Sequence, residues 1–260
     1  MSLVINGHQL YVITRGPEDG PAVVLLHHGL GFARAWRRQA PALATAGYHV
    51  ILYDRWGYGK SAPRPALSLP CFEDDQSDLL TLLDNMGIKR AALIGHSDGG
   101  TIALYFAAAH PERVACLATI AAHIYVEPKM GIGIVGVRQA FENDADFRQR
   151  FQRAHGKQYQ QVFDNWFNGW SKPEHLSWDM RPVLRQIHCP VLVIQGLEDE
   201  HATPQHAKDI AAAIPGAELW LIPGAGHMLQ RDAARELNQK LLEFLGSHVT
   251  DTSYVMRNKN

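Results

Sequence analysis

Short apolar runs alternate with helix-forming segments along most of this chain. Runs such as AVVLLH at 22–27 and YHVILYD at 48–54 are largely apolar, which is typical of strands buried on both faces of a sheet. The segments between them, such as FEDDQSDLLTLLDNMG at 72–87, have apolar residues at helical spacing and end at glycine or proline. Strands connected through helices pair in parallel, so the alternation predicts a three-layer α/β fold.

The predicted elements begin with a hairpin in 2–16. The further strands are expected at 22–27, 48–54, 90–95, 113–122, 190–196 and 217–222, and the helices between them at 32–47, 72–87, 101–110, 203–214 and 228–246.

The alternation stops in the middle of the chain, where a stretch rich in Trp, Phe, Gln and His contains no strand-like run. Helices are expected there at 140–156, 158–170 and 175–187. The sequence therefore predicts one α/β core interrupted by a helical cap. The expected divisions are a core of residues 1–122 and 187–247, a cap of residues 123–186, and a polar C-terminal tail of residues 248–260.

Composition excludes several classes of function. The 260 residues carry a formal net charge of −1, so we expect no nucleic-acid partner and no membrane partner, since both require a concentrated basic face. The fourteen histidines are scattered without HxH or HExxH, so no metal site is expected. Cys71, Cys116 and Cys189 are widely spaced, and no leader-like segment is evident, so we expect free thiols and a cytoplasmic protein. The sequence leaves homo-oligomer formation open.

Residues 95–99, GHSDG, match the pattern G-x-S-x-G between a predicted strand and a predicted helix. A serine at such a sharp turn needs glycine on both sides, because a side chain there would collide with neighbouring backbone. The helix N-terminus beneath Ser97 favours developing negative charge. The sequence therefore predicts Ser97 as a nucleophile, rather than a chance match in a loop.

A serine nucleophile requires a base, and the base requires an orienting acid. His227 lies in the loop PGAGHM after the last predicted strand, and this loop opens at the same sheet edge as Ser97. The acid is expected after the preceding strand, in QGLEDEHATP. Asp199 is the preferred acid, and Glu198 is the alternative.

The loop HHGLG at 27–31 follows the first buried strand, and its glycines let backbone N–H groups approach a ligand. We expect the N–H groups of Leu30 and Asp98 to form an oxyanion hole. A tight turn without this function is the alternative reading of the loop.

With these pieces assembled, the chain resembles the serine esterases of the α/β-hydrolase superfamily along nearly its whole length. The matching motifs are HHGLG, YDRWGYGKS, GHSDGG, GLED and GAGH, in this order. The resemblance implies the α/β-hydrolase fold, a mostly parallel sheet flanked by helices with a helical cap insertion. It also implies structural roles for Asp54 and Arg55. Serine at the turn argues against the haloalkane dehalogenase and epoxide hydrolase branches, which need a carboxylate nucleophile.

Within the superfamily, GHSDGG, AAHIYVE at 121–127 and the Trp-rich cap are similar to the biphenyl-hydrolase-like group, which includes valacyclovir hydrolase. Asp98 is acidic where a neutral residue is common. A carboxylate facing the pocket would favour a cationic amine, such as that of an aminoacyl ester. The alternative is that Asp98 caps its helix or pairs with a local residue such as His123.

Several residues of the expected cap are candidates for binding substrate. They are His123, Met130, Trp166 and Trp170, with Trp178 and Phe167 as further candidates and Glu127 as a source of negative charge at the site mouth. Holding the cap onto the core is an equally good explanation of the aromatic residues.

These residues together predict a cofactor-free serine hydrolase of small carboxylic esters. One alternative is a carbon–carbon bond hydrolase with the same triad, whose carboxylate substrates call for basic residues in the pocket. Another is a binding protein of low turnover. Perhydrolysis would be a side activity of the same triad.

Overall fold

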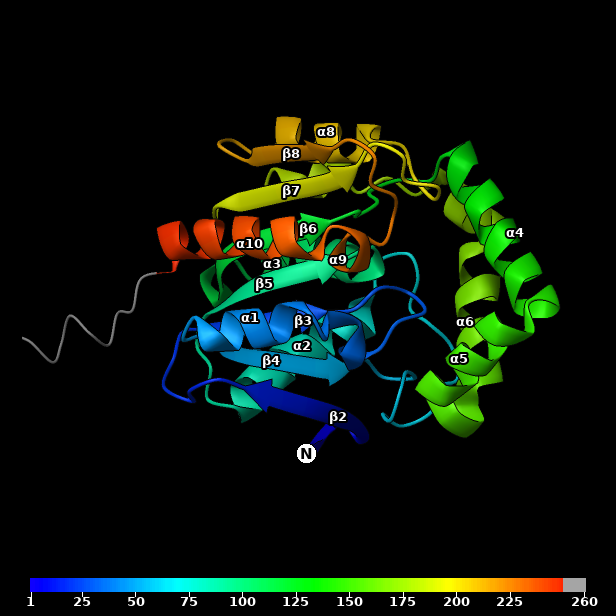
Figure 1. The fold of residues 1–260 in the computed structure, drawn as a ribbon, viewed down its shortest axis with the longest axis horizontal. Coiled ribbons are helices and arrows are strands. Elements are labelled where there is room, and N and C mark those ends of the chain that lie inside the picture. The colour runs from blue at the N-terminus through cyan, green and yellow to red at the C-terminus, as the bar shows by residue number, and fades with distance from the viewer. Residues whose placement is uncertain (250–260) are drawn as a thin grey trace, which may run out of the picture.

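The fold is described from a computed structural model, which covers residues 1–249. One eight-stranded sheet crosses the molecule in the order β1-β2-β4-β3-β5-β6-β7-β8 (Figure 1). Its first two strands are antiparallel and all later neighbours are parallel. The strands are β1 (Ser2–Ile5), β2 (His8–Arg15), β3 (Ala22–Leu26), β4 (His49–Asp54), β5 (Ala91–His96), β6 (Val114–Ile120), β7 (Val191–Gly196) and β8 (Glu218–Ile222). Every predicted strand is present, and the α/β fold class is confirmed.

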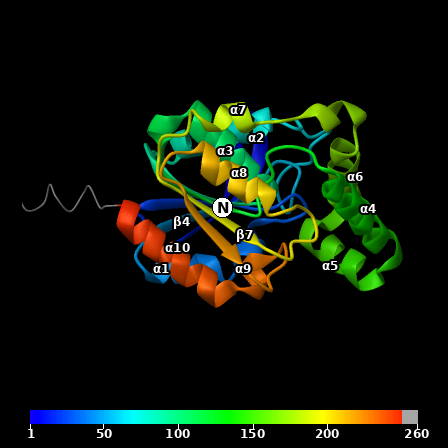
Figure 2. The same ribbon diagram turned by 90° about the horizontal axis from the view of Figure 1, so that it is seen from above.

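Helices cover both faces of this sheet (Figure 2). On one face lie α2 (Glu73–Asn85), α3 (Asp98–Ala109), α7 (Arg181–Leu184) and α8 (Gln205–Ala213), and on the other lie α1 (Gln39–Thr45), α9 (Leu229–Asp232) and α10 (Ala234–His248). β4 and β5 are buried along their whole length, because both of their faces are covered. The apolar runs in the sequence are explained by this double burial.

Three further helices, α4 (Pro128–Asn143), α5 (Ala145–His155) and α6 (Tyr159–Trp170), lie beyond the ends to which the parallel strands point (Figure 1). They pack on one another through a separate apolar cluster, in which Phe141 stacks on Phe163 with ring centroids 3.8 Å apart. An isolated bridge between Tyr125 and Asp179 joins the two ends of this segment. The helices therefore form a cover over the carboxyl edge of the sheet.

Two core helices are broken where the sequence predicts continuous ones. The predicted helix at 32–47 is a 3₁₀ turn, Ala33–Trp36, followed by α1. The turn is pinned by Asp54, whose Oδ1 accepts a hydrogen bond of 2.7 Å from the N–H of Ala33. The predicted helix at 228–246 divides into α9 and α10 at Ala233, whose backbone is not helical.

The helices of the cover differ most from expectation. α4 was not predicted, because Gly131, Gly133 and Gly136 lower its helix propensity. The single helix expected at 140–156 is two helices, since Asp144 adopts an extended conformation and its side chain caps α5. The prediction of a helix at 175–187 was wrong. That stretch holds the end of a 3₁₀ turn, Pro173–Ser177, and the four residues of α7.

The predicted polar tail begins too early, because α10 continues to His248, and its residues 250–260 lie outside the described part of the chain. No helix within residues 1–249 combines the length and the apolar character needed to cross a membrane.

Candidate active site

Ser97 lies at the turn from β5 into α3, with the strained backbone angles φ 54° and ψ −121°. The flanking glycines are explained by contacts. A Cβ on Gly95 would meet the carbonyl of Gly99, and a Cβ on Gly99 would meet the carbonyl of Leu26. The turn is therefore packed against both its own helix and the neighbouring strand. Ser97 remains 8% exposed and lines a cavity of about 750 Å³.

His227 and Asp199 are joined by a hydrogen bond of 2.8 Å from Nδ1 to Oδ2. Asp199 also accepts bonds from the Nε2 of Gln195 and from the N–H groups of His201 and Ala202. Burial raises the pKa of Asp199, but the bonds from His227 and the backbone outweigh it, so the net pKa is lowered. Asp199 is therefore ionised and acts only as an acceptor, so the Nδ1 of His227 donates in this bond, and in the neutral imidazole Nε2 is the acceptor.

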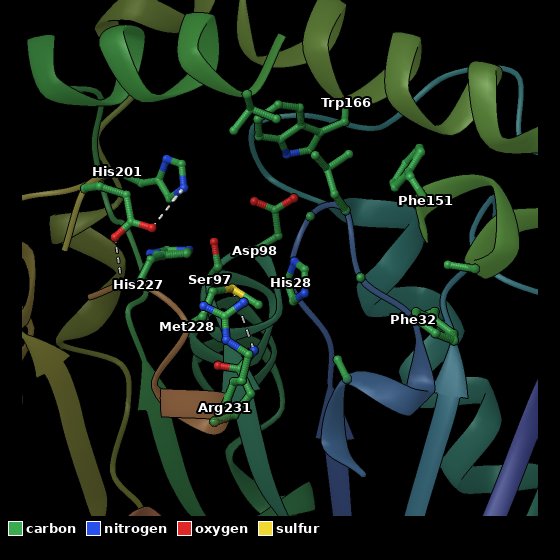
Figure 3. Close-up of a pocket in the computed structure, with 18 of the residues that line it drawn as sticks. His28, Phe32, Ser97, Asp98, Phe151, Trp166, His201, His227, Met228 and Arg231 are labelled. Carbon is green, nitrogen blue, oxygen red and sulfur yellow. Dashed lines mark hydrogen bonds and ion pairs between the residues drawn. The ribbon is translucent and has the colours of Figure 1, made fainter. Parts of the chain in front are cut away.

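The serine hydroxyl stands beside the imidazole of His227 (Figure 3). The structure thus brings together Ser97, His227 and Asp199, from the ends of three different strands. Glu198, the alternative acid, is exposed and has no bond to His227.

The loop that carries His227 is held by residues that sequence reasoning missed. His96 donates from Nε2 to the carbonyl of His227 at 2.9 Å, and its Nδ1 accepts from Gln230 at 3.0 Å. Burial lowers the pKa of His96 well below its ordinary value, so the ring is neutral and can donate from Nε2 while it accepts at Nδ1. Glu200 accepts from the N–H of His227. His96 is the variable residue of the GHSDG motif, but nothing in the sequence indicates its partner.

The two expected oxyanion donors belong to adjoining turns. Asp98 is the first residue of α3, so its N–H has no acceptor inside the helix. Leu30 lies in the turn closed by the bond from the N–H of Gly31 to the carbonyl of His28. Both residues line the cavity beside Ser97. The arrangement is compatible with two N–H groups directed at one oxygen.

The carboxylate of Asp98 points into the cavity below Trp166 (Figure 3). It lies 3.9 Å from Arg55 and 3.4 Å from His123, and its Oδ2 has no hydrogen-bond partner among the described residues. Burial raises the pKa of Asp98 to about 6 against the opposing charge of Arg55, and burial lowers the pKa of His123 to about 3. Above pH 6 the site therefore holds a buried negative charge beside Ser97. Capping by the side chain is absent, whereas the other alternative for Asp98, pairing with a local residue such as His123, is found in these two contacts.

The cavity has a volume of about 750 Å³ and lies between the sheet edge and α4–α6. All four predicted substrate-binding residues of the cap, His123, Met130, Trp166 and Trp170, line it.

Three further candidates do not line the cavity. Trp178 donates to the hydroxyl of Tyr105 and packs against Trp170, and Phe167 stacks on Phe163 within the cover. Glu127 binds the hydroxyl of Thr203 at 2.8 Å. It adds no charge to the site mouth.

Asp54 and Arg55 of the motif YDRWGYGKS do not line the cavity but stabilise the chain around it. Asp54 accepts from the N–H groups of Ala33 and Lys60, so it ties two loops together. Arg55 is fully buried and binds Asp75 at 3.0 Å. Within residues 1–249, no three His, Cys, Asp or Glu side chains gather as a metal site would require.

Comparison with known proteins agrees with this architecture. The family described as alpha/beta hydrolase fold matches residues 21–171. Human serine hydrolase BPHL is 29% identical over 94% of this chain and 85% of its own length. The 2-hydroxy-6-oxo-6-phenylhexa-2,4-dienoate hydrolase of Comamonas testosteroni is 30% identical over 87% of this chain and 88% of its own. The enol-lactonase of Burkholderia xenovorans LB400 superposes with a TM-score of 0.77, at 23% identity, over 95% of this chain and 100% of its own. The chain belongs to the alpha/beta hydrolase fold family and is a hydrolase.

Proposed function

We propose that this hydrolase cleaves small carboxylic esters through Ser97, His227 and Asp199. The observation that carries the proposal is the hydrogen bond between His227 and an ionised, buried Asp199, with the serine hydroxyl beside the same imidazole. This arrangement supports acyl transfer by a serine nucleophile with a histidine base and an orienting acid. No cofactor takes part in the proposed reaction.

In the proposed mechanism, His227 Nε2 removes the proton of the Ser97 hydroxyl as the oxygen attacks the ester carbonyl. Asp199 fixes the imidazole and stabilises its charged form. The N–H groups of Leu30 and Asp98 bind the oxyanion. The imidazolium returns its proton to the leaving alcohol, and an acyl-enzyme forms. A water molecule then repeats the sequence and releases the carboxylic acid.

The proposed substrates carry a cationic amine close to the ester. Asp98 supports this preference, because its Oδ2 is buried, faces the cavity and lacks a hydrogen-bond partner among the described residues. An ammonium group would supply the missing donors and neutralise the charge. The pKa of about 6 for Asp98 sets the pH range, since the carboxylate becomes neutral as the pH falls through 6 and the preference is lost.

Cleavage of a carbon–carbon bond is the second candidate, and the dienoate hydrolases among the relatives favour it. Their printed names describe carboxylate substrates. The basic residues that such substrates call for are present, since five arginines line the cavity, but the carboxylate of Asp98 lies beside Ser97 and would repel an anionic group next to the bond that is cleaved. Ester cleavage is therefore the better supported reaction.

The proposal is tested with p-nitrophenyl acetate and butyrate, using the wild type and Ser97→Ala. The wild type should turn over both esters and Ser97→Ala should be at background. Equal turnover by both proteins would mean that another residue is the nucleophile. If neither protein is active and ligands bind equally to both, the low-turnover binding protein is the better reading.

The amine preference is tested by comparing valine and isovalerate esters of the same alcohol, which differ in the ammonium group. The wild type should prefer the valine ester at pH 7, where the amine is charged and Asp98 is ionised, and Asp98→Asn should lose about tenfold or more of that preference, because a charged hydrogen bond is replaced by a neutral one. Taking the ratio of the two substrates at each pH cancels effects on His227. A ratio that does not change between pH 5 and pH 7 would contradict the role of Asp98.

A further inference from the structure

Five arginines line the same cavity as Ser97. They are Arg34, Arg37, Arg38, Arg150 and Arg231, and they come from the 3₁₀ turn before α1, from the two residues between that turn and α1, from α5 and from α9. The cavity contains only two carboxylates within the described residues, Asp98 and Glu200. Since the whole chain has a net charge of −1, this excess of positive charge is local to the cavity.

Three of these arginines, Arg34, Arg37 and Arg150, are exposed and form no ion pair within residues 1–249. The arginines that do form ion pairs in the described chain are Arg55, Arg64, Arg113, Arg138, Arg181 and Arg231. The guanidinium groups of Arg34, Arg37 and Arg150 are therefore available to an anion.

Two aromatic residues that line the cavity lie close in sequence to two of these arginines. Arg34 lies two residues after Phe32, and Arg150 directly precedes Phe151. Phe32 and Phe151 lie across the cavity from His227, on the far side of Asp98 (Figure 3). The backbone that carries Arg34 and Arg150 therefore lies on the side of the cavity remote from His227.

We propose that the natural substrate carries an anionic group, a phosphate or a carboxylate, at the end remote from its ester bond, and that Arg34, Arg37 and Arg150 bind it. This inference rests on the proposed esterase function and adds a substrate class to it. Guanidinium groups suit such oxyanions because their N–H donors match the spacing of the oxygens. The contact is made equally with bound substrate and transition state, so it lowers KM and leaves kcat unchanged.

The test uses butyrate esters of three alcohols of equal length, which end in a phosphate, a carboxylate or a methyl ether. Butyrate avoids any dependence on an amine. For the wild type, kcat/KM should be about tenfold higher for the better anionic ester than for the methyl ether, since each exposed charge pair contributes modestly. The phosphate and carboxylate arms identify which anion fits.

The triple variant Arg34→Gln/Arg37→Gln/Arg150→Gln should lose this preference and cleave the methyl ether ester as the wild type does. Arg153→Gln is the matched control, because Arg153 is exposed on the same helix α5 but does not line the cavity. It should keep the preference.

The outcomes separate the two proposals. If the methyl ether ester is not cleaved at all, the esterase function is wrong. If it is cleaved and the anionic esters are not preferred, or if the preference survives in the triple variant, the inference about the arginines is overturned. Raising NaCl from about 0.02 M to about 0.3 M should weaken the preference in the wild type, because salt screens exposed charges.

Discussion

The two walls of the cavity are built differently. The wall that carries Ser97 and His227 is held by hydrogen bonds between buried polar groups, such as that from His96 to the loop carbonyl of His227. The wall formed by α4–α6 is held by aromatic packing, with Phe141 stacked on Phe163. Acyl transfer requires reacting atoms in a fixed geometry, whereas accommodation of a substrate requires shape and apolar surface. In the proposed mechanism, the first wall serves the chemistry and the second serves recognition.

The largest effect expected from this comparison is on the first wall. Asp199→Asn should lower kcat/KM for p-nitrophenyl butyrate by about 10⁴-fold, because the amide no longer fixes the tautomer of His227 or stabilises its charge. Glu198→Gln is the control and should keep full activity, since Glu198 is exposed. Steady-state kinetics of the two variants would refute the assignment if Glu198→Gln were the inactive one.

A mutation in the second wall should change substrate binding rather than the chemical step. Phe163→Ala removes the stacking partner of Phe141 and should destabilise the cover by about 3–5 kcal/mol. We expect KM for butyrate esters to rise and hydrogen exchange in α4–α6 to quicken, with the sheet unchanged. Phe244→Ala, in the core helix α10, is the comparison variant. It should lower the free energy of unfolding of the whole molecule without raising KM, and equal effects on KM would contradict the division into two walls.

Asp98 lies where the two walls meet, and its buried charge should lower stability. Its pKa is raised from 3.8 to about 6, so the stability it contributes is full below pH 4 and is lost as the pH rises through 6. The loss amounts to about 3 kcal/mol. Asp98→Asn should therefore gain about this much relative to wild type between pH 4 and pH 8. Urea unfolding at both pH values measures it, and a difference independent of pH would argue against a buried carboxylate that titrates.

The smallest expected effect concerns the support of the His227 loop. Gln230→Leu removes the bond to His96 Nδ1 and should reduce kcat several-fold, consistent with the loss of one hydrogen bond of about 1 kcal/mol. Gln239→Leu on the exposed face of α10 should have no effect. If both variants have wild-type kcat, the His96–Gln230 contact does not position the base.

The sequence predicts the first wall better than the second for a physical reason. Ser97, Asp199 and His227 each follow a strand whose apolar run is unmistakable, so their meeting at one sheet edge follows from the order of elements. Contacts such as His96 with Gln230 cannot be predicted in this way, because they depend on side-chain directions across distant loops.

The second wall lacks local signals of comparable strength. The glycines of α4 lower its helix propensity, so the sequence does not predict this helix. The periodicity of the apolar residues predicts one helix across Asp144, whereas the N-cap at Asp144 begins a second helix. The candidates Met130, Trp166 and Trp170 line the cavity. Trp178 lies in the same Trp-rich segment of the sequence, but it packs behind the cavity. Aromatic residues serve both purposes, and only the packed structure separates them.

The bridge between Tyr125 and Asp179 means that the chain leaves the sheet edge and returns to it at one point. Residues 126–178 therefore form a cassette whose two ends lie side by side, and Met130, Trp170 and Trp178 pack it into the main hydrophobic core. Exchange of this cassette between related enzymes would transplant substrate choice while the reaction stays in place. Related enzymes that keep the residues at the sheet edge and differ in this insertion would then differ in the substrates that they accept.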